Sequence, residues 1–388
     1  MEKQTDVVII GGGAAGLCLG ILLAQKAVSV DLVEPFPAPP LSDVQPSGRS
    51  AALFGSSIDL IQETGIWESL ALFCEPLRTM KIIDNDAQSI FSSEEIGRDL
   101  FGYNVPNGPL RACLHERAME IKTLTLHALC SLESFESDGA GVSARLDNGT
   151  GLRAPLLIGA DGRNSAVRGT AGVQTQTKDY GQSALTFLIK HERPHNSTAS
   201  EFHKPGGPLA LVPMPGDCSA VVWVEKTEDA QSLLTLKKHE LSERVTYLSS
   251  GLLGPCEIVT PVQSWPLAMI AAKSLIGERM ALIAEAAHVM PPISAQGLNL
   301  SLRDIRDLRD LILQTRRVGL DIGSSTMLNR YDSLRRPDMK LRQMGIDFLN
   351  RSVMTTSTAG QKTRRLGLQA TSHFTLLKRL LMREGMKI

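Results

Sequence analysis

The sequence lacks several features that would place it in particular classes of protein. Its six cysteines form no Cys-x-x-Cys pair and no other metal-ligand spacing, which argues against a metal site and favours a reducing compartment. The 41 basic and 41 acidic residues cancel, so no overall charge attracts nucleic acid or an acidic surface. The sequence shows neither a leader-like N-terminus nor the run of roughly 18 apolar residues that a membrane span needs. We therefore expect a soluble, cytoplasmic protein that does not bind nucleic acid.

A glycine-rich turn near the N-terminus is the first positive signal. Residues 6–10 read as a short buried strand, GGGAAG leads into an apolar helix, and VSVDLVE reads as a second strand. Gly11, Gly13 and Gly16 fit the Gly-x-Gly-x-x-Gly pattern of a dinucleotide-binding turn. In such a turn the glycines allow a tight bend and the approach of a pyrophosphate, and an acid such as Glu34 accepts hydrogen bonds from ribose. The alternative is a glycine turn that binds nothing.

The choice between NAD and FAD stays open at this point, because both use the same kind of turn. No second unit of this kind follows in the 388 residues, so we expect one dinucleotide to be bound in this manner. The length suits about two domains or one large composite domain.

Two later stretches each end an apolar strand with a carboxylate. In LLIGADGR the strand is followed by Asp161, although Asp-Gly by itself most often marks only a turn. In RMALIAE the strand ends at Glu285, and Pro291-Pro292 precede a helix that we expect to start near Leu298. The positive end of a helix dipole there would suit an electron-rich ring such as a reduced flavin. A capped strand, loop and helix without a ligand is the alternative.

Together the three stretches resemble the motifs of FAD-dependent aromatic hydroxylases with the fold of para-hydroxybenzoate hydroxylase. GGGAAG with Glu34 is similar to that family's FAD fingerprint, IGADGRNSAVR to its middle Asp-Gly motif, and AEAAHVMPPISAQGLN to its flavin-side motif. Finer matches resemble the branch of ubiquinone-biosynthesis hydroxylases: GRSAALFGSSIDLIQETGIW, VPNGPLRACLHERA and GPLALVPMPGDCSAVVW. The resemblance covers nearly the whole chain. It implies an α/β fold with a Rossmann-like FAD-binding domain, an interleaved β-sheet substrate domain and a C-terminal helical segment.

The resemblance also implies roles for particular residues. It places Asp161 near the pyrophosphate and the nicotinamide route, and Glu285 at the ribityl chain. It places backbone and side-chain groups of Gly297, Leu298 and Asn299 at the flavin's pyrimidine edge. The residues implied to bind FAD are Gly11, Gly13, Ala14, Ala15, Gly16, Glu34, Arg49, Arg111, Asp161, Glu285, Gly297, Leu298 and Asn299. Those whose backbone groups are implied to face flavin and substrate in catalysis are Pro292, Gly297 and Leu298. His288 is expected to be structural, and no metal is expected.

The implied reaction is hydroxylation of an aromatic ring, that of a prenylated ubiquinone precursor or another phenol. NADH or NADPH reduces FAD, molecular oxygen adds to give a C4a-hydroperoxide, and one oxygen atom passes to the ring. Because the cofactor carries out the difficult chemistry, the lack of an obvious nucleophile or acid/base pair in the sequence is consistent with this reaction.

Two other functions remain open. One is an isoprenoid reductase or epoxidase on the same flavin fold, since the motifs report the cofactor rather than the substrate. The other is a flavin-poor accessory subunit of a ubiquinone biosynthetic complex. Two departures from the family pattern motivate it: Ala284-Glu285 stands where the family usually has Gly-Asp, and Ser294 where it usually has Gly.

We expect four divisions of the chain. Residues 1–174 would form the FAD-binding domain with interleaved substrate-domain segments, 175–275 mainly the substrate sheet, 276–345 the rest of the FAD-binding domain, and 346–388 basic amphipathic helices. The runs ALTFLI, LALVPM and SAVVWVE are typical of strands. Each of four side chains on them is a candidate either for the substrate pocket or for the core: Phe187, Val212, Met214 and Trp223.

The C-terminal segment is rich in basic residues. Glu384 is its single acid, and its basic residues are Lys362, Arg364, Arg365, Lys378, Arg379, Arg383 and Lys387. A basic amphipathic helix can rest on the surface of an anionic membrane or contact a partner in a biosynthetic complex. Alternatively, it can dock on the body of the protein with its charges in water.

Overall fold

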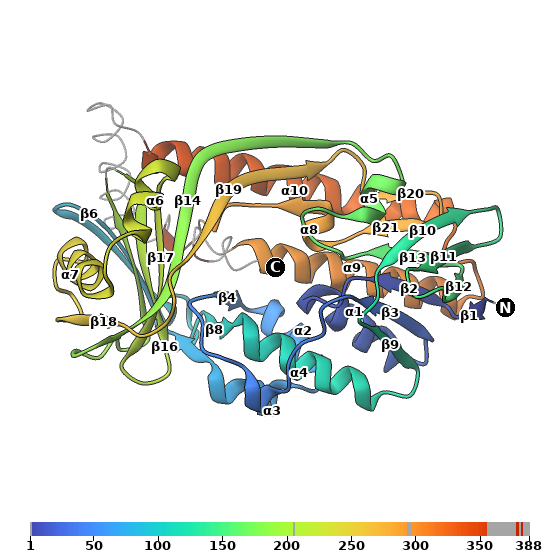
Figure 1. Cartoon of the computed structure of the whole chain (residues 1–388), viewed down its shortest axis with the longest axis horizontal. Coiled ribbons are helices and arrows are strands. Elements are labelled where there is room, and N and C mark those ends of the chain that lie inside the picture. Colours follow the sequence, from blue (N-terminus) through green and yellow to red (C-terminus); the bar gives the residue numbers. More distant parts are fainter. Residues whose placement is uncertain (1, 205, 293–295, 355–377, 380–381, 383–388) are drawn as a thin grey trace.

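The computed structural model describes residues 2–204, 206–292, 296–354, 378–379 and 382. Figure 1 shows a parallel sheet with its helices on the right and a broad, mostly antiparallel sheet on the left. Strands β14 (Thr175–His191) and β19 (Gln263–Ala272) extend between these regions, and helix α10 (Ser325–Met354) runs along the top. The predicted mixed α/β fold is confirmed. Within the described residues, no helix combines the length and apolar character needed to cross a membrane.

The parallel sheet has the strand order β20-β21-β13-β2-β3-β9. All neighbours are parallel except β20 and β21. Stretches such as VVII and LLIG are completely buried, which is typical of parallel strands covered on both faces. The strands are β2 (Val7–Ile10), β3 (Val30–Glu34), β9 (Leu124–Ala128), β13 (Leu156–Gly159), β20 (Ile276–Gly277) and β21 (Met280–Leu282).

The carboxyl ends of β2, β3, β13 and β21 lie along one edge of this sheet, because parallel strands point the same way. Helix α1 (Ala14–Ala24) connects β2 to β3, as the sequence predicts. The three motifs, far apart in sequence, are therefore brought to one edge. Ligands of open parallel sheets bind at this kind of edge.

The large sheet has nine strands in the order β22-β19-β14-β17-β16-β15-β6-β7, with β18 also paired to β14. It combines strands from before and after the Asp161 motif, which gives the interleaved connectivity. Besides β14 and β19, its strands are β6 (Thr79–Asp84), β7 (Ala87–Ser92), β15 (Thr198–His203), β16 (Pro208–Met214), β17 (Cys218–Lys226), β18 (Cys256–Ile258) and β22 (His288–Val289). Helices α6 (Thr227–Leu234) and α7 (Lys238–Leu248) share an apolar core with one face of it.

Two smaller sheets complete the strand structure of the described residues. One has the order β1-β12-β11-β10 and the other β4-β8-β5. Their strands are β1 (Lys3–Gln4), β4 (Ser50–Phe54), β5 (Glu75–Leu77), β8 (Gly102–Pro106), β10 (Leu132–Ser137), β11 (Val142–Leu146) and β12 (Gly151–Ala154). The remaining helices are α2 (Ser56–Glu63), α3 (Trp67–Leu70), α4 (Asn107–Glu120), α5 (Ala166–Thr170), α8 (Ala284–Ala287) and α9 (Gln296–Arg317), with 3-10 turns η1 (Leu41–Asp43), η2 (Ala71–Phe73) and η3 (Ser93–Ile96).

Two features of the C-terminal region bear on the predicted basic segment. Helix α10 runs from Ser325 to Met354 and so includes residue 346, where we expect the last division of the chain to begin. Residues 355–377 lie outside the described residues. Of those beyond them, Lys378 donates a hydrogen bond of 2.6 Å to Glu95, and the side chain of Met382 packs in a cluster with Phe54 and Phe101. These two residues dock on the body of the protein.

Candidate functional site

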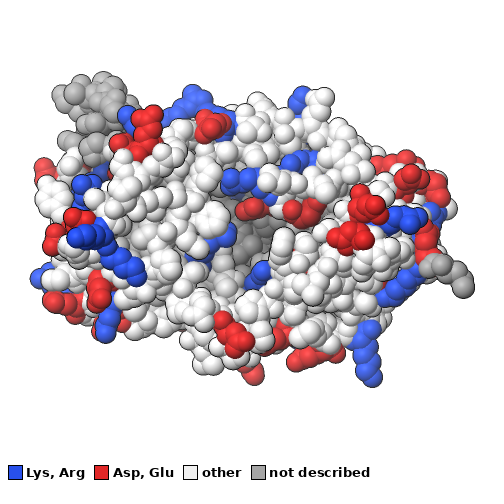
Figure 2. Space-filling view, viewed as in Figure 1, with Lys and Arg blue, Asp and Glu red and all other residues white. Residues whose placement is uncertain are grey.

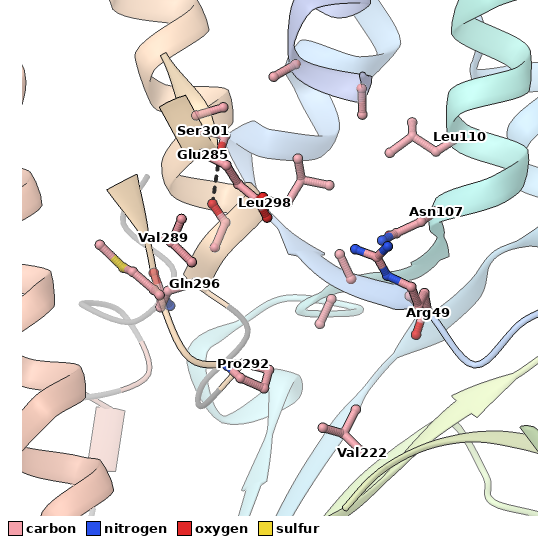
Figure 3. A pocket seen from close by; sticks show the side chains of 18 of the residues that line it. Arg49, Asn107, Leu110, Val222, Glu285, Val289, Pro292, Gln296, Leu298 and Ser301 are labelled. Atoms are coloured by element: carbon pink, nitrogen blue, oxygen red, sulfur yellow. Dashed lines mark hydrogen bonds between the residues drawn. The ribbon is translucent and has the colours of Figure 1, made fainter. Parts of the chain in front are cut away.

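A large cavity separates the carboxyl edge of the parallel sheet from the exposed face of the large sheet. Its volume is about 1170 Å³. Figure 2 shows a hollow in the middle of one face of the molecule, with basic and acidic side chains at its rim. In Figure 3, Arg49 and Asn107 lie on one side and Glu285 and Leu298 on the other, while Val222 belongs to the sheet below. The cavity therefore joins the dinucleotide motif to the predicted substrate sheet.

The glycine turn has the backbone geometry that the pattern predicts. Gly11 has φ +108°, and a Cβ atom there would lie 2.4 Å from the carbonyl oxygen of Ala160. A Cβ on Gly16 would lie 1.9 Å from the carbonyl oxygen of Gly11. Gly13 differs, because a Cβ added there would meet nothing within 4 Å and would point into open space beside the start of α1. The first and third glycines are needed for packing, and the second leaves room for a ligand.

Glu34 is held firmly at the end of β3. Its carboxylate accepts hydrogen bonds from the backbone N–H of Gly12 at 2.5 Å and of Phe36 at 2.7 Å. Arg111 lies beside it, with Nη2 3.4 Å from Oε1, and also donates to the carbonyl oxygens of Gly12 and Phe36. Both side chains line the cavity. Arg111 from α4 is thus brought next to the glycine turn.

Asp161 has one carboxylate oxygen in use and one free. Oδ2 accepts a hydrogen bond of 3.1 Å from the N–H of Val167 at the start of α5. Oδ1 is buried and has no hydrogen-bond partner among the described residues, although Asp161 lines the cavity. An unpaired buried carboxylate oxygen costs free energy, so its presence at a cavity wall indicates a ligand that donates a hydrogen bond to it.

Two asparagines that sequence reasoning missed have the same property. Asn104 in β8 and Asn107 in α4 both line the cavity, and the side-chain oxygen of each is buried without a partner in the described part of the chain. Asn104 is positioned by its Nδ2, which donates to the carbonyl oxygen of Pro213 at 2.9 Å. Asn107 lies in the stretch VPNGPLRACLHERA that resembles the family, but it was not assigned a role, and no sequence signal distinguished Asn104.

Ala284 and Glu285 lie in the one-turn helix α8, where the family usually has Gly-Asp. Ala284 has φ +54°, a conformation that costs a residue with a side chain about 1–2 kcal/mol. Its N–H donates to Oδ2 of Asp304 at 3.1 Å, which holds this backbone in place. Glu285 lines the cavity, and its side chain is exposed there. Ser294, the other departure, lies outside the described residues.

A buried cluster of polar and charged side chains, centred on Asp304, holds the backbone of Ala284 in place. Asp304 is 2% exposed; its Oδ2 lies 2.6 Å from Nε2 of His288 and its Oδ1 accepts from Nε of Arg335 at 2.8 Å. Burial by itself would raise the pKa of Asp304, but its interactions with His288 and Arg335 outweigh burial, so the pKa is lowered. His288 also lines the cavity. Its hydrogen bond to Asp304 helps to hold this buried carboxylate in place, which is consistent with the structural role expected for His288.

The start of α9 places two of its three predicted residues at the cavity. Gly297 and Leu298 line it, and the hydroxyl of Ser301 donates to the carbonyl oxygen of Gly297 at 3.0 Å (Figure 3). The side chain of Asn299 is directed elsewhere: Nδ2 donates to the carbonyl oxygen of Ala52 at 2.7 Å, and Oδ1 accepts from the N–H of Phe54 at 3.2 Å. A contact between Asn299 and the flavin therefore stays a prediction, and the hydrogen bonds described here give this side chain a structural role. It ties α9 to β4.

Most of the other predicted residues also line this cavity. Pro292 lines it, and the guanidinium of Arg49 lies 4.4 Å from the ring centroid of Trp265. Ala14 and Ala15 also line it, whereas Gly16 lies behind the turn. In the described part of the chain no group of three or more His, Cys, Asp or Glu side chains is placed to hold a metal ion.

The large sheet decides which of the four candidate side chains lie at the cavity and which lie in the core. Val222 and Val224 of β17 line the cavity, whereas Trp223 between them is 3% exposed and packs in the core under α6 and α7. Phe187 belongs to that same core, and Met214 packs in a small separate cluster. Of the four candidates, only Val212 lines the cavity. Successive strand residues point to opposite faces, and the sequence does not reveal which face is covered by helices.

Comparisons with known proteins agree with this site. A family model described as an FAD binding domain matches residues 4–341. The chain is 34% identical over 386 residues to ubiquinone hydroxylase UbiL of Rhodospirillum rubrum, covering 99% of this chain and 90% of that protein. It is 30% identical over 384 residues to the 3-demethoxyubiquinol 3-hydroxylase of Escherichia coli, covering 97% of both.

Solved structures share the fold. The p-nitrophenol 4-monooxygenase PnpA from Pseudomonas putida has a TM-score of 0.82 at 16% identity, covering 99% of this chain and 98% of that one. A variant of HpxO from Klebsiella pneumoniae, complexed with FAD, has a TM-score of 0.78 at 18% identity and 97% coverage of both chains.

The fold and the cavity define a flavoprotein of the oxygenase type. Gly13 leaves space beside the start of α1, and Asp161 offers an unpaired oxygen to a donor, so the residues present fit FAD. The family model matches residues 4–341, and two curated relatives are 30% identical or more over nearly the whole chain. The chain therefore belongs to the family of FAD-dependent aromatic-ring hydroxylases and is an FAD-dependent monooxygenase.

Proposed function

We propose that the protein hydroxylates the aromatic ring of a prenylated ubiquinone precursor. The names of the two curated relatives, a ubiquinone hydroxylase and a demethoxyubiquinol hydroxylase, support this substrate class. The observation that carries the proposal is the continuity of the cavity from the glycine turn to an apolar sheet face. That face offers a surface for an apolar substrate, with side chains that include Ile82, Ala210, Val212, Val222 and Val224.

The residues are proposed to act as follows. Gly11 and Gly13 with the start of α1 bind the pyrophosphate, Gly16 lets α1 pack closely behind the turn, and Glu34 binds the adenosine ribose. The arginines Arg49 and Arg111 contact the middle of the cofactor. The remaining proposed contacts are those of Ala14, Ala15, Asp161, Glu285, Gly297 and Leu298, with Pro292 facing the substrate ring. When bound, FAD supplies the oxygen-transfer chemistry, and NADH or NADPH supplies the electrons.

The first test is whether the purified protein retains FAD and oxygenates a phenol. After incubation with FAD and gel filtration, we expect a flavin absorption spectrum. With a reductant, ¹⁸O₂ and a short-chain prenylated phenol, mass spectrometry should show one ¹⁸O atom in the product. Product reduced or epoxidised on the isoprenoid chain, rather than on the ring, would favour the reductase or epoxidase. Protein without flavin would favour the accessory role.

We further propose that the protein rests on an anionic membrane surface, which would bring it to a prenylated substrate. Three side chains of α10 that share one face are strongly exposed: Leu341 (71%), Met344 (71%) and Phe348 (72%). An apolar helix face and basic residues together favour binding to anionic lipid. The basic segment beyond residue 354 would add the charge.

Sedimentation with vesicles tests this contact. We expect binding to vesicles containing anionic lipid to fall at high salt, and to fall several-fold in the double variant Leu341→Ser with Phe348→Ser. Tyr247→Ser is the matched control, because Tyr247 is 82% exposed on α7, away from this face. Equal sedimentation of all three proteins at both salt concentrations would rule the contact out.

A further inference from the structure

Two ionisable side chains lie on the cavity face of the large sheet. In β15, Glu201 and His203 line the cavity, while Phe202 between them is 2% exposed in the core on the other face. This alternation is that of a regular strand. Most other cavity-lining residues of the neighbouring strands are apolar: Met80, Ile82, Phe91, Pro208, Ala210, Leu211, Val212, Val222 and Val224. The pair is therefore a polar spot on a largely apolar wall.

The pair is joined by a hydrogen bond that fixes the form of the imidazole. Nε2 of His203 lies 2.9 Å from Oε1 of Glu201. An ionised carboxylate can only accept, so in the neutral imidazole Nε2 carries the proton and donates it, and Nδ1 keeps a free lone pair. The side chain of His203 is 7% exposed and that of Glu201 is 29% exposed.

Nδ1 of His203 is buried and has no hydrogen-bond partner among the described residues. Leaving such an acceptor unpaired costs about 1–3 kcal/mol. Pro208, which faces His203 across the β15–β16 pair, has no N–H to donate. A carboxylate-oriented imidazole with a free acceptor nitrogen is the arrangement of a general base.

We propose that His203 accepts the proton of the substrate's ring hydroxyl and that Glu201 positions it, an inference that rests on the proposed function. In this step the phenol O–H bond breaks, an Nδ1–H bond forms on His203, and the electron pair stays on the oxygen as phenolate. The carboxylate of Glu201 stabilises the imidazolium. The step is redox-neutral, and it enriches the ring in electrons before an oxygen atom is added. The proton returns to the product oxygen before release.

Other ionisable side chains also line the cavity in which this proton transfer would occur. Lys81 is on the neighbouring strand β6, where it is paired with Ser200, one position before Glu201. The remaining ionisable residues that line the cavity belong to the cofactor side or its surroundings: Glu34, Arg49, Arg111, Asp161, Glu285 and His288.

The experiment uses the FAD-loaded protein and 4-nitrophenol, whose neutral and ionised forms absorb at different wavelengths. When 4-nitrophenol is bound to the wild type, its hydroxyl should ionise at a lower pH than it does in water. In His203→Gln the ionisation of the bound probe should move up by about one pH unit. In Glu201→Gln, where the imidazole of His203 loses its carboxylate partner, the pH at which the bound probe ionises should rise by a smaller amount. His239→Gln, which removes an exposed histidine of α7, should match the wild type.

Turnover of the prenylated phenol gives the second readout. We expect kcat of His203→Gln to fall by roughly 100-fold with little change in KM, and activity to recover partly at high pH, where the phenol ionises unaided. Retained FAD and an unchanged circular dichroism spectrum would show that the variant is folded. If the wild type ionises the probe and hydroxylates phenols but His203→Gln does both equally well, this inference fails alone. If the wild type hydroxylates no phenol, the proposed function fails.

Discussion

A Gly13→Val variant should fold normally and fail to retain FAD. The backbone of Gly13 has φ −69° and ψ 179°, which valine adopts without strain, and a Cβ there meets no atom of the protein within 4 Å. The added side chain instead fills the space beside the start of α1 where we place the pyrophosphate. We expect FAD affinity to fall by at least about 100-fold, or roughly 2.7 kcal/mol, as measured by fluorescence titration.

The unfolding temperature of the apoprotein separates this effect from misfolding. It should be the same for Gly13→Val and the wild type. Gly345→Val is the matched control, since Gly345 is exposed in α10 and a Cβ there also meets nothing within 4 Å. Normal FAD affinity in Gly13→Val would show that the glycine turn does not border the cofactor.

Replacing Asp304 with alanine should have the largest effect on stability. Its carboxylate accepts hydrogen bonds from the N–H of Ala284 and from Arg335, and its Oδ2 lies 2.6 Å from His288. Removing it leaves the guanidinium of Arg335, only 4% exposed, without its most buried partner. Loss of one member of a buried ion pair costs about 3–5 kcal/mol. Chemical denaturation should show this loss, and Asp310→Ala, which removes a half-exposed acid of α9, should change stability little.

The lowered pKa of Asp304 gives this prediction a pH dependence. Burial would raise the pKa, but His288 and Arg335 lower it overall, so the folded state holds the proton less tightly than the unfolded chain. The stabilisation is therefore complete above the unfolded pKa of about 3.9 and is lost as the pH falls through the folded value. Asp304→Asn should be less stable at neutral pH and should lose less stability on acidification. Parallel acid-unfolding curves for this variant and the wild type would contradict the assignment.

Local chemistry explains why much of the cofactor half was predictable. Gly11 must adopt φ +108°, which glycine tolerates and other residues resist, so its position in the pattern carries structural information. The strand ends before Asp161 and Glu285 were recognisable because buried parallel strands are continuous apolar runs. Helix α9 begins at Gln296, close to the predicted start near Leu298.

The substrate half was less predictable. Phe187 and Trp223 are large and apolar, and their strands were recognised, yet both point away from the cavity into the core beneath α6 and α7. The use of Asn299 to hold β4 depends on a contact between residues far apart in sequence. The free nitrogen of His203 and the unpaired oxygens of Asn104 and Asn107 appear only once every hydrogen bond in the fold has been assigned.

The sequence by itself determined the class of fold, the glycine turn and the family, because these depend on residues close together whose backbone requirements are strict. Tertiary structure decided which face of each strand meets the cavity, since a period of two residues is compatible with either face. It also decided which polar atoms remain unpaired there. Hydrogen bonding is completed between distant segments, and the groups left over, such as Oδ1 of Asp161 and Nδ1 of His203, are the ones available to cofactor and substrate.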